Sequence, residues 1–496
     1  MNTRSIKPFG AFAALAASAA LAITASVLPP GAARAADKAP VNVGLIYSKT
    51  GLLGGYGAQY AEGFAIGLDY ATHGTGSAAG HKIVVTERDD AGDPAKAVAA
   101  AKDLIGANTR ILAGSTSSGV ALTLAPLAAE NKVLFISGPA AADAITGNNA
   151  FTFRSGRQTY QDVATAASAV GDLHGKKVLV VAQDSAFGQA NFKAVEAVLG
   201  TEKGADVASL YVPLSASDFA PFAQKIKDTK PDLLFVAWAG ATGEALFKTL
   251  DDQGIFAVTK VVTGLADRAS YATFRPVESK VTFLSYYFYQ APKSAANDFL
   301  VAALKKQGKV PDLFDPDGFV AAQMIVRAVE KADGDDPAKT TAALADWSFE
   351  GPKGRETIRG ADHAMLQPMF VAKLAGAEPQ VVRELDAAAV APPPHPFKCA
   401  AKERRKKQAR NHFPQMGSVE GTSCCPSSGA SASDIGTSHV NPQYQPNIWS
   451  TDVPRRNPEL HRLQPPLCLY RERTRVLRGQ GLHQQAEPMP RLSRRA

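Results

Sequence analysis

Four consecutive hydroxyl side chains, at positions 115–118, form the clearest candidate binding element of the sequence. They lie between two short apolar runs, 111–113 and 133–136, so the stretch 110–141 predicts a strand–helix–strand unit. In a parallel sheet, ligands bind beyond the carboxyl ends of the strands, and the free N–H groups at a helix start favour an anion. The hydroxyl cluster is predicted at that place. We expect Pro126 to kink or end the helix between the two strands.

Two other patterns suggest different chemistry but match it poorly. The glycine-rich turn 50–57 follows a predicted strand, yet its glycines have the spacing G-x-x-G-x-x-G instead of the G-x-G-x-x-G of dinucleotide-binding proteins. The pair Asp89 and Asp90 could serve a metal or an acid–base reaction. We favour a structural role, in which these carboxylates end a strand and help to cap a helix whose early position suits Pro94.

The main part of the chain lacks the residues on which an enzyme would depend. It contains no cysteine, no G-x-S-x-G nucleophile motif and no phosphate-binding loop. Its four histidines are scattered through predicted loops, where we expect them to face solvent; they are His73, His81, His174 and His363. The sequence therefore predicts no enzymatic activity, no cofactor and no metal site.

The first 36 residues are typical of a secretory signal peptide. Arg4 and Lys7 precede an apolar segment, 9–28, and the A-R-A of 33–35 matches a cleavage site. A membrane anchor is the alternative, which a short apolar run interrupted by Ser and Thr disfavours. We expect cleavage after residue 35 or 36 and a mature protein in the periplasm.

The composition changes abruptly near residue 395. Residues 395–496 contain 17 Lys and Arg against 7 Asp and Glu, which is a net charge of +10. Because the whole chain has a net charge of +8, residues 1–394 are slightly acidic. The four cysteines also lie here, without a consistent metal-ligand spacing; they are Cys399, Cys424, Cys425 and Cys468. One interpretation is a basic arm for nucleic acid. We favour an unstructured tail that arises from a frameshift or read-through, and no nucleic-acid partner.

Between these ends, apolar strands alternate with helical patterns. The 496 residues are 45% hydrophobic and 20% charged, as expected of a globular protein with a sizeable core and more than one lobe. Predicted strands lie at 41–47, 82–87, 111–113, 133–136, 178–182, 208–212, 232–238, 258–263 and 281–289. This alternation predicts an α/β fold with parallel sheets.

Six motifs occur in a characteristic order. They are T-G-x-x-x-x-Y-G at 50–57, D-D-x-x-D-P at 89–94, the serine-rich turn at 115–118, I-S-G-P-A-A-A at 136–142, D-x-x-F-G at 184–188 and D-F-x-P-F at 218–222. In this order the chain resembles the type I periplasmic binding proteins of ABC transporters, in particular the branched-chain amino-acid (Leu/Ile/Val) binding proteins. The resemblance covers about residues 41–374.

This resemblance implies two three-layer lobes with central parallel sheets, joined by a three-segment hinge, with the ligand held between them. We place lobe 1 at 37–155 and 286–350, and lobe 2 at 156–285 and 351–394. The implied function is to capture a branched-chain-like amino acid or a related small carboxylate and deliver it to the permease of an ABC transporter in the inner membrane. We expect a monomer. A ligand-sensing module of the same fold is a further alternative, which the signal peptide disfavours.

The resemblance also assigns ligand-binding positions in the first lobe. Ser118, with Ser117 beside it, would donate to the ligand carboxylate together with N–H groups at the helix start. Ala140 and Ala141 follow the next strand, where family members use a backbone carbonyl and a side-chain hydroxyl for the ligand ammonium. The hydroxyl is missing here.

The second lobe departs further from the family. Tyr56 and Phe187 match aromatic positions of the first and second lobes, and Trp238 lies next to Ala239, which replaces a family tyrosine. The carboxylate that pairs with a ligand ammonium has only Asp267 as a candidate, after a small register shift.

These departures leave two ligand classes open. One is an amino acid. The other is an aromatic or aliphatic carboxylate without an α-amino group, recognised by the same serine turn and by an aromatic wall of Trp238, Tyr287 and Phe187.

Overall fold

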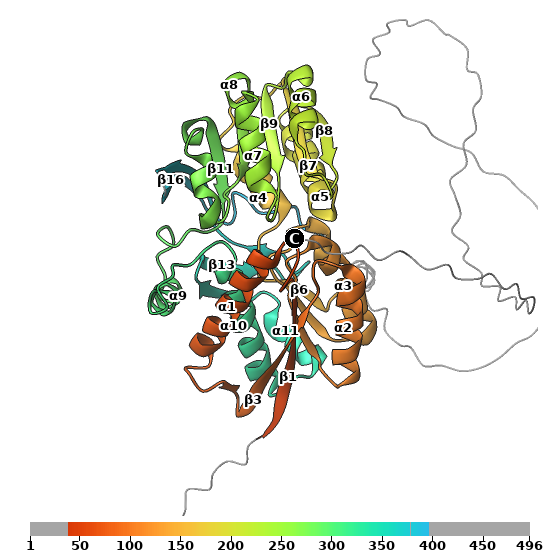
Figure 1. Ribbon diagram of the computed structural model, residues 1–496. Coiled ribbons are helices and arrows are strands. Elements are labelled where there is room, and N and C mark those ends of the chain that lie inside the picture. The colour runs from red at the N-terminus through yellow and green to blue at the C-terminus, as the bar shows by residue number, and fades with distance from the viewer. Residues whose placement is uncertain (1–37, 377, 396–496) are drawn as a thin grey trace, which may run out of the picture. The chain divides into compact units, whose positions relative to one another are not determined.

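The computed structural model describes residues 38–376 and 378–395 (Figure 1). The predicted signal peptide, 1–36, and residues 396–496 of the predicted tail lie outside the described residues, and both stay predictions. Within the described part, two large sheets flanked by helices confirm the predicted α/β fold of two lobes.

The first sheet has six strands in the order β2-β3-β1-β4-β5-β6. Their bounds are β1 Lys38–Tyr47, β2 Ser77–Ala78, β3 His81–Asp89, β4 Ile111–Ala113, β5 Leu134–Ser137 and β6 Thr152–Arg154. All neighbours pair parallel except β2 with β3. Strands β4 and β5 are buried along their whole length, as expected of central strands covered on both faces.

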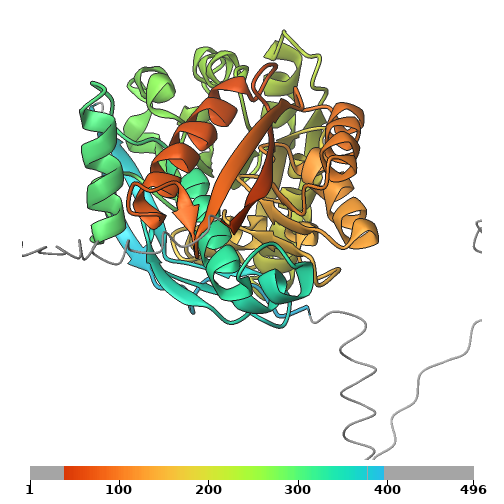
Figure 2. The same ribbon diagram turned by 90° about the horizontal axis from the view of Figure 1, so that it is seen from below.

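Helices cover both faces of the first sheet (Figures 1 and 2). One face packs against α1 (Gly54–Ala71) and α10 (Asp315–Ala332), and the other against α2 (Pro94–Gly106) and α3 (Ser118–Asn131). Glycines let α1 and α10 approach closely, since a Cβ on Gly318 would lie 1.9 Å from the carbonyl oxygen of Tyr60. The short helix α11 (Pro337–Leu344) follows α10, and Leu344 joins the same core.

The second sheet has seven strands in the order β16-β15-β11-β10-β9-β7-β8. Their bounds are β7 Lys177–Gln183, β8 Asp206–Val212, β9 Leu233–Ala237, β10 Lys260–Gly264, β11 Val281–Ser285, β15 Met369–Ala375 and β16 Glu378–Leu385. The strands from β8 to β11 pair parallel, whereas β15 and β16 pair antiparallel. The accompanying helices are α4 Thr159–Ala167, α5 Ala186–Val195, α6 Ala220–Thr229, α7 Gly243–Asp252 and α8 Ile255–Val258. Helix α9 (Ala295–Lys305) packs instead against α1, where Phe299 contacts Tyr70.

The chain passes between the two large sheets three times, after β6, after β11 and before β15, in agreement with the predicted three-segment hinge. Between the last two passages lies a third, small sheet of β12 (Ser348–Gly351), β13 (Gly354–Ile358) and β14 (Met365–Leu366). Ile358 and Met365 pack into the core of the first lobe, although the predicted division places 351–394 in lobe 2. The remaining lobe boundaries stay predictions.

Several element bounds differ from those expected. Helix α3 continues through Pro126 to Asn131, so the helix does not end at the proline. Helix α1 begins inside the glycine-rich turn, at Gly54. Capping and tertiary packing, which the apolar period does not report, decide these ends.

Candidate functional site

A cavity of about 580 Å³ lies beyond the carboxyl ends of strands from both large sheets. Its walls come from the segments that follow β3, β4 and β5 in the first lobe and β7, β9 and β10 in the second. This is the position at which parallel α/β sheets bind ligands. The cavity is therefore the candidate binding site.

The serine turn after β4 is ordered by a buried carboxylate. Asp90, with no exposed surface, accepts from Ser48 Oγ at 2.6 Å and from Ser115 Oγ at 2.8 Å. Thr116 Oγ1 donates to Ser48 Oγ at 2.6 Å, and the amide of Ser117 donates to Ser115 Oγ at 3.0 Å. These hydrogen bonds fix the backbone that leads into α3.

This network corrects the predicted role of the two aspartates. Helix α2 is capped by Asp93, whose carboxylate accepts from the amides of Ala95 and Lys96. Asp89 instead accepts from the hydroxyl of Thr50 at 2.6 Å, and Asp90 holds the serine turn. Neither of them caps α2, because the N-cap is Asp93, the residue directly before Pro94.

Both predicted serines line the cavity at the start of α3. Ser117 is the N-cap, and its Oγ accepts from the amide of Val120 at 3.5 Å. Ser118 is 4% exposed, and its Oγ accepts from the amide of Ala142 at 3.2 Å. Since this bond uses the oxygen as acceptor, the hydroxyl proton of Ser118 remains able to donate to a ligand. A hydroxyl donor at a helix N-terminus suits a carboxylate.

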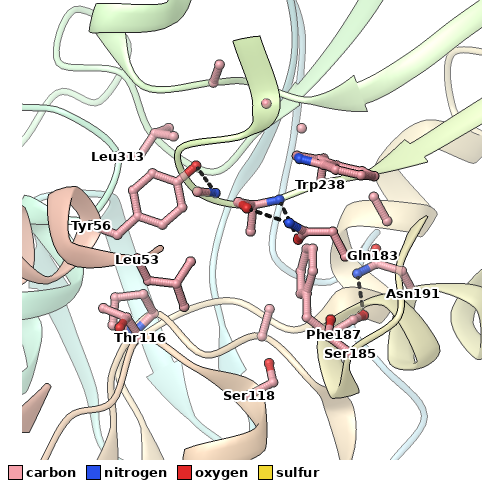
Figure 3. Close-up of a pocket in the computed structure, with 18 of the residues that line it drawn as sticks. Leu53, Tyr56, Thr116, Ser118, Gln183, Ser185, Phe187, Asn191, Trp238 and Leu313 are labelled. Atoms are coloured by element: carbon pink, nitrogen blue, oxygen red, sulfur yellow. Dashed lines mark hydrogen bonds between the residues drawn. The ribbon is translucent and has the colours of Figure 1, made fainter. Parts of the chain in front are cut away.

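Tyr56 reaches from α1 across to the second lobe (Figure 3). Its hydroxyl oxygen accepts from the amide of Gly240 at 3.1 Å, and its ring lies 4.5 Å from that of Phe314. Burial raises the pKa of Tyr56 to about 12, so its hydroxyl keeps its proton at neutral pH. Tyr56 therefore lines the cavity as a bridge between lobes that still has a proton to donate.

Phe187 and Trp238 line the second-lobe wall, on the other side of the pocket from Tyr56 (Figure 3). Trp238 packs edge-on against Phe219, and its Nε1 donates to Thr242 Oγ1 at 3.1 Å. Because its one polar atom is already bonded, the indole offers an apolar surface to a ligand.

The side-chain amide of Gln183 fixes the turn that follows Trp238. Its Nε2 donates to the carbonyl of Ala239 at 3.0 Å, and its Oε1 accepts from the amide of the same residue at 3.1 Å. This two-point contact pairs the end of β7 with the backbone beyond β9. Gln183 is thus a cavity-lining residue whose polar groups are satisfied within the protein.

An ion pair contributes the charged part of the lining. Arg157 Nε lies 3.2 Å from an oxygen of Asp162, and Nη1 donates to the carbonyl of Pro139 at 3.1 Å. Burial opposes the charge of Arg157, but Asp162 and neighbouring groups outweigh it and raise the pKa of the guanidinium. Burial also raises the pKa of Asp162, although Arg157 acts in the opposite direction.

Three residues expected in the site lie outside the cavity lining. Ala140 is buried, while Pro139 and Ala141 on either side line the cavity. Asp267 caps a 3₁₀ helix, accepting from the amide of Ser270 at 3.1 Å and from its hydroxyl at 2.6 Å. Tyr287 is fully buried and its hydroxyl donates to Asn297 Oδ1 at 2.8 Å.

Other lining residues escaped the sequence-based prediction. Tyr286, the neighbour of Tyr287, lines the cavity instead, and so do Arg157, Asp162 and Gln183. Gln183 directly follows the predicted strand 178–182, which is a position that could have signalled it. Nothing in the local sequence indicates that Arg157 and Asp162 meet.

Two other kinds of feature, a metal-binding cluster and a membrane-spanning helix, are absent from the described residues. Within 38–376 and 378–395, no cluster of His, Cys, Asp and Glu is arranged to hold a metal ion. In the same part of the chain, no helix is long and apolar enough to cross a membrane.

Comparison with known proteins identifies the family of this chain. Residues 40–378 match the profile of the periplasmic binding proteins. A Leu/Ile/Val-binding protein from Rhizobium johnstonii is 26% identical over 311 residues, covering 62% of this chain and 84% of that protein.

Two crystal structures from Rhodopseudomonas palustris have the same fold. An ABC-type branched-chain amino acid transporter protein of strain CGA009 is 35% identical, with a TM-score of 0.60, over 72% of this chain and 100% of that one. A solute-binding protein of an ABC transporter from strain BisB5, in complex with 3,4-dihydroxybenzoic acid, is 27% identical, with a TM-score of 0.61. The match covers 70% of this chain and 98% of that one. The chain belongs to the periplasmic binding protein family, the solute-binding proteins of ABC transporters.

Proposed function

We propose that this protein captures a small carboxylate that lacks an α-amino group, with an aromatic or aliphatic body, and delivers it to the permease of an ABC transporter in the inner membrane. One observation carries the choice of ligand. The lining includes the hydroxyl of Ser118, a donor that suits a carboxylate, but no unpaired buried carboxylate for an ammonium group, since Asp162 is paired with Arg157. Glu244, which also lines the cavity, is exposed to solvent at the start of α7.

The second-lobe wall supports an apolar ligand body. Ala237, Leu265 and Ala266 follow or end β9 and β10 and bring only apolar side chains to the cavity. Phe187 and Trp238 add aromatic surface to the same wall. An apolar ligand body gains about 25 cal/mol for each Å² removed from water, and aromatic rings add edge or stacking contacts.

The relatives support both ligand classes that the sequence leaves open. The solute-binding protein from strain BisB5 holds an aromatic acid, whereas the relatives named for Leu, Ile and Val favour an amino acid. An amino acid is therefore the second candidate, with its ammonium near the backbone of Pro139 and Ala141. We favour the carboxylate without an amino group, because Asp267, the predicted partner of a ligand ammonium, is engaged as a helix cap outside the cavity.

The cellular part of the proposal rests on the signal peptide and the family. The predicted leader, 1–36, would export the chain to the periplasm. There the two lobes would close over the ligand and present it to the permease.

A ligand panel tests the proposal directly. The mature protein is screened by thermal shift and then by titration calorimetry against benzoate, 4-hydroxybenzoate, 3,4-dihydroxybenzoate and hexanoate, with leucine and valine as the competing class. Benzyl alcohol is the control that lacks the carboxylate. We expect stabilisation by one or more of the acids and none by the amino acids or the alcohol. Stabilisation by leucine or valine alone would overturn the choice of ligand, and no response to either class would overturn the function.

A further inference from the structure

The guanidinium of Arg157 occupies acceptors that would otherwise attract a ligand cation. Nη1 donates to the carbonyl of Pro139 at 3.1 Å, and Nε lies 3.2 Å from a carboxylate oxygen of Asp162. Both partners line the cavity. A backbone carbonyl and a carboxylate are the two kinds of acceptor that an ammonium group needs when it leaves water.

The position of Arg157 is fixed from several sides. Its guanidinium lies over the ring of Tyr286, 4.9 Å from the ring centre, and its side chain is 13% exposed. Asp162 has 11% of its side chain exposed, so the ion pair is screened far less than a surface pair would be. The nearby carboxylate of Asp317 is itself paired with Lys353 at 2.9 Å. Arg157 is thus held at the cavity wall by contacts that do not depend on a ligand.

One edge of the guanidinium remains available. Nε and Nη1 have partners, whereas Nη2 makes no hydrogen bond with any residue of 38–376 and 378–395. Since Arg157 lines the cavity, a ligand oxygen is a suitable acceptor for this remaining N–H₂ group.

We propose that Arg157 is the residue that selects against α-amino acids, by placing a cation of the protein itself beside two cavity-lining acceptors that a ligand ammonium could otherwise use. This inference rests on the proposed function, because it assumes a carboxylate ligand bound at Ser118. A ligand ammonium would meet a fixed positive charge that already bonds to both acceptors. A ligand without an amino group would meet no such repulsion and would gain a donor from Nη2.

The inference predicts that removing one side chain changes the class of ligand. In Arg157→Ala the carbonyl of Pro139 and the carboxylate of Asp162 lose their cation and gain space. An amino acid could then place its ammonium there, so we expect leucine or valine to bind at least about tenfold more tightly than to the parent protein. Carboxylates without an amino group should bind about tenfold more weakly, because they lose the Nη2 donor.

Three matched variants separate charge from space. Arg157→Lys keeps the positive charge and should still reject amino acids. The double variant Arg157→Ala with Asp162→Asn has the space but no carboxylate, and it should lose the gain in amino-acid binding. Asp162→Asn alone leaves Arg157 without its counter-charge, and we expect it to bind carboxylates more tightly than the parent. This last arm keeps the inference testable if the buried charge left in Arg157→Ala prevents folding.

Isothermal titration of each variant, with its thermal unfolding recorded as a check of folding, gives the answer. A folded Arg157→Ala that still rejects amino acids, or an Asp162→Asn that binds carboxylates no more tightly, would overturn the role of Arg157. Failure of the proposed function looks different, since the parent protein itself would then bind no carboxylate. The two failures are therefore distinguishable in one series.

Discussion

The hydroxyl oxygen of Tyr56 accepts a hydrogen bond from the backbone amide of Gly240, 3.1 Å away and 184 residues later in the chain. Tyr56 belongs to α1 of the first lobe, and Gly240 follows β9 of the second. A second contact runs beside it, in which the amide of Ala241 donates to the carbonyl of Leu52 at 3.2 Å. These hydrogen bonds join the two lobes at the edge of the ligand cavity and suggest where lobe closure is stabilised.

Tyr56→Phe should weaken ligand binding through this contact. The variant keeps the ring that packs on Phe314 but leaves the amide of Gly240 without its acceptor. A neutral hydrogen bond contributes roughly 0.5–1.5 kcal/mol, so the dissociation constant should rise about two- to tenfold in calorimetric titration. Tyr70→Phe is the control, because the Tyr70 hydroxyl makes no hydrogen bond within the described residues. Equal affinities of the parent and Tyr56→Phe would contradict a role in closure.

Gly240→Ala should weaken binding more than Tyr56→Phe does. Gly240 has a φ of +81°, and a Cβ there would lie 2.5 Å from the carbonyl oxygen of Leu52 in the opposite lobe. The methyl group therefore both strains the backbone and separates the lobes. Gly55→Ala serves as control, since a Cβ at Gly55 would meet no atom within 4 Å. Comparing the affinities of both variants, with the melting temperatures as a check, tests the prediction; parent-like affinity in Gly240→Ala would refute it.

Ser118→Ala should weaken any carboxylate ligand. The side chain is buried at the cavity and has a free hydroxyl proton, and a hydrogen bond to a charged group contributes about 1–3 kcal/mol. Thr123→Ala, in the same helix, is the matched control because Thr123 Oγ1 bonds to the carbonyl of Gly119 instead. Calorimetry on the best ligand of the panel provides the measurement. Unchanged affinity would remove Ser118 from the site.

Asp90→Asn should weaken binding from a distance. The carboxylate accepts from Ser48 and Ser115, and an amide at the same position can accept through only one oxygen. The serine turn would lose one charge-assisted bond, with a loss of stability of about 1–3 kcal/mol and a weaker affinity for carboxylates. Denaturant unfolding and calorimetry measure the two effects. The exposed Asp103→Asn in α2 should change neither, and a fully parent-like Asp90→Asn would show that the turn holds its shape unaided.

His363 makes stability depend on pH below neutrality. His363 is buried, so the expectation that it faces solvent was wrong. Burial against Phe153, on which its ring stacks, lowers the pKa of His363 to about 4. The unfolded chain takes up the proton near the ordinary pKa of about 6.5, so the stabilising contribution is complete above that pH and is lost as the pH falls toward 4. The shift corresponds to about 3 kcal/mol of unfolding free energy.

The comparison of variants isolates this effect. Burial raises the pKa of Glu356 to about 7, and this carboxyl contributes in the opposite direction over part of the same range. His363→Asn should therefore show a smaller loss of stability between pH 6.5 and pH 4 than the parent, measured by denaturant unfolding at each pH. Exposed His73→Asn should retain the slope of the parent. An identical slope in His363→Asn would exclude His363 as its source.

The sequence by itself determined the strands β1, β3–β5 and β7–β11, the serine turn and the family, but not the strands β2, β6 and β12–β16. These features depend on neighbouring residues only. An apolar run, a group of hydroxyl residues and a helical period predict a strand, a turn and a helix without knowledge of the rest of the fold. Ser117 and Ser118 were predicted from this pattern, whereas Tyr56, Phe187 and Trp238 were predicted from the resemblance to the family, and all five line the cavity.

Only the tertiary structure decided which residues of the second lobe and the hinge line the cavity. Where a strand ends, a shift of one residue turns a side chain from the core to the cavity, so Tyr286 lines the site and Tyr287 does not. Asp267 is similarly used by its own 3₁₀ helix. Arg157 acquires its role by meeting Pro139 and Asp162, contacts that exist only once β5 and α4 are brought together, and no local pattern in the sequence records such a meeting.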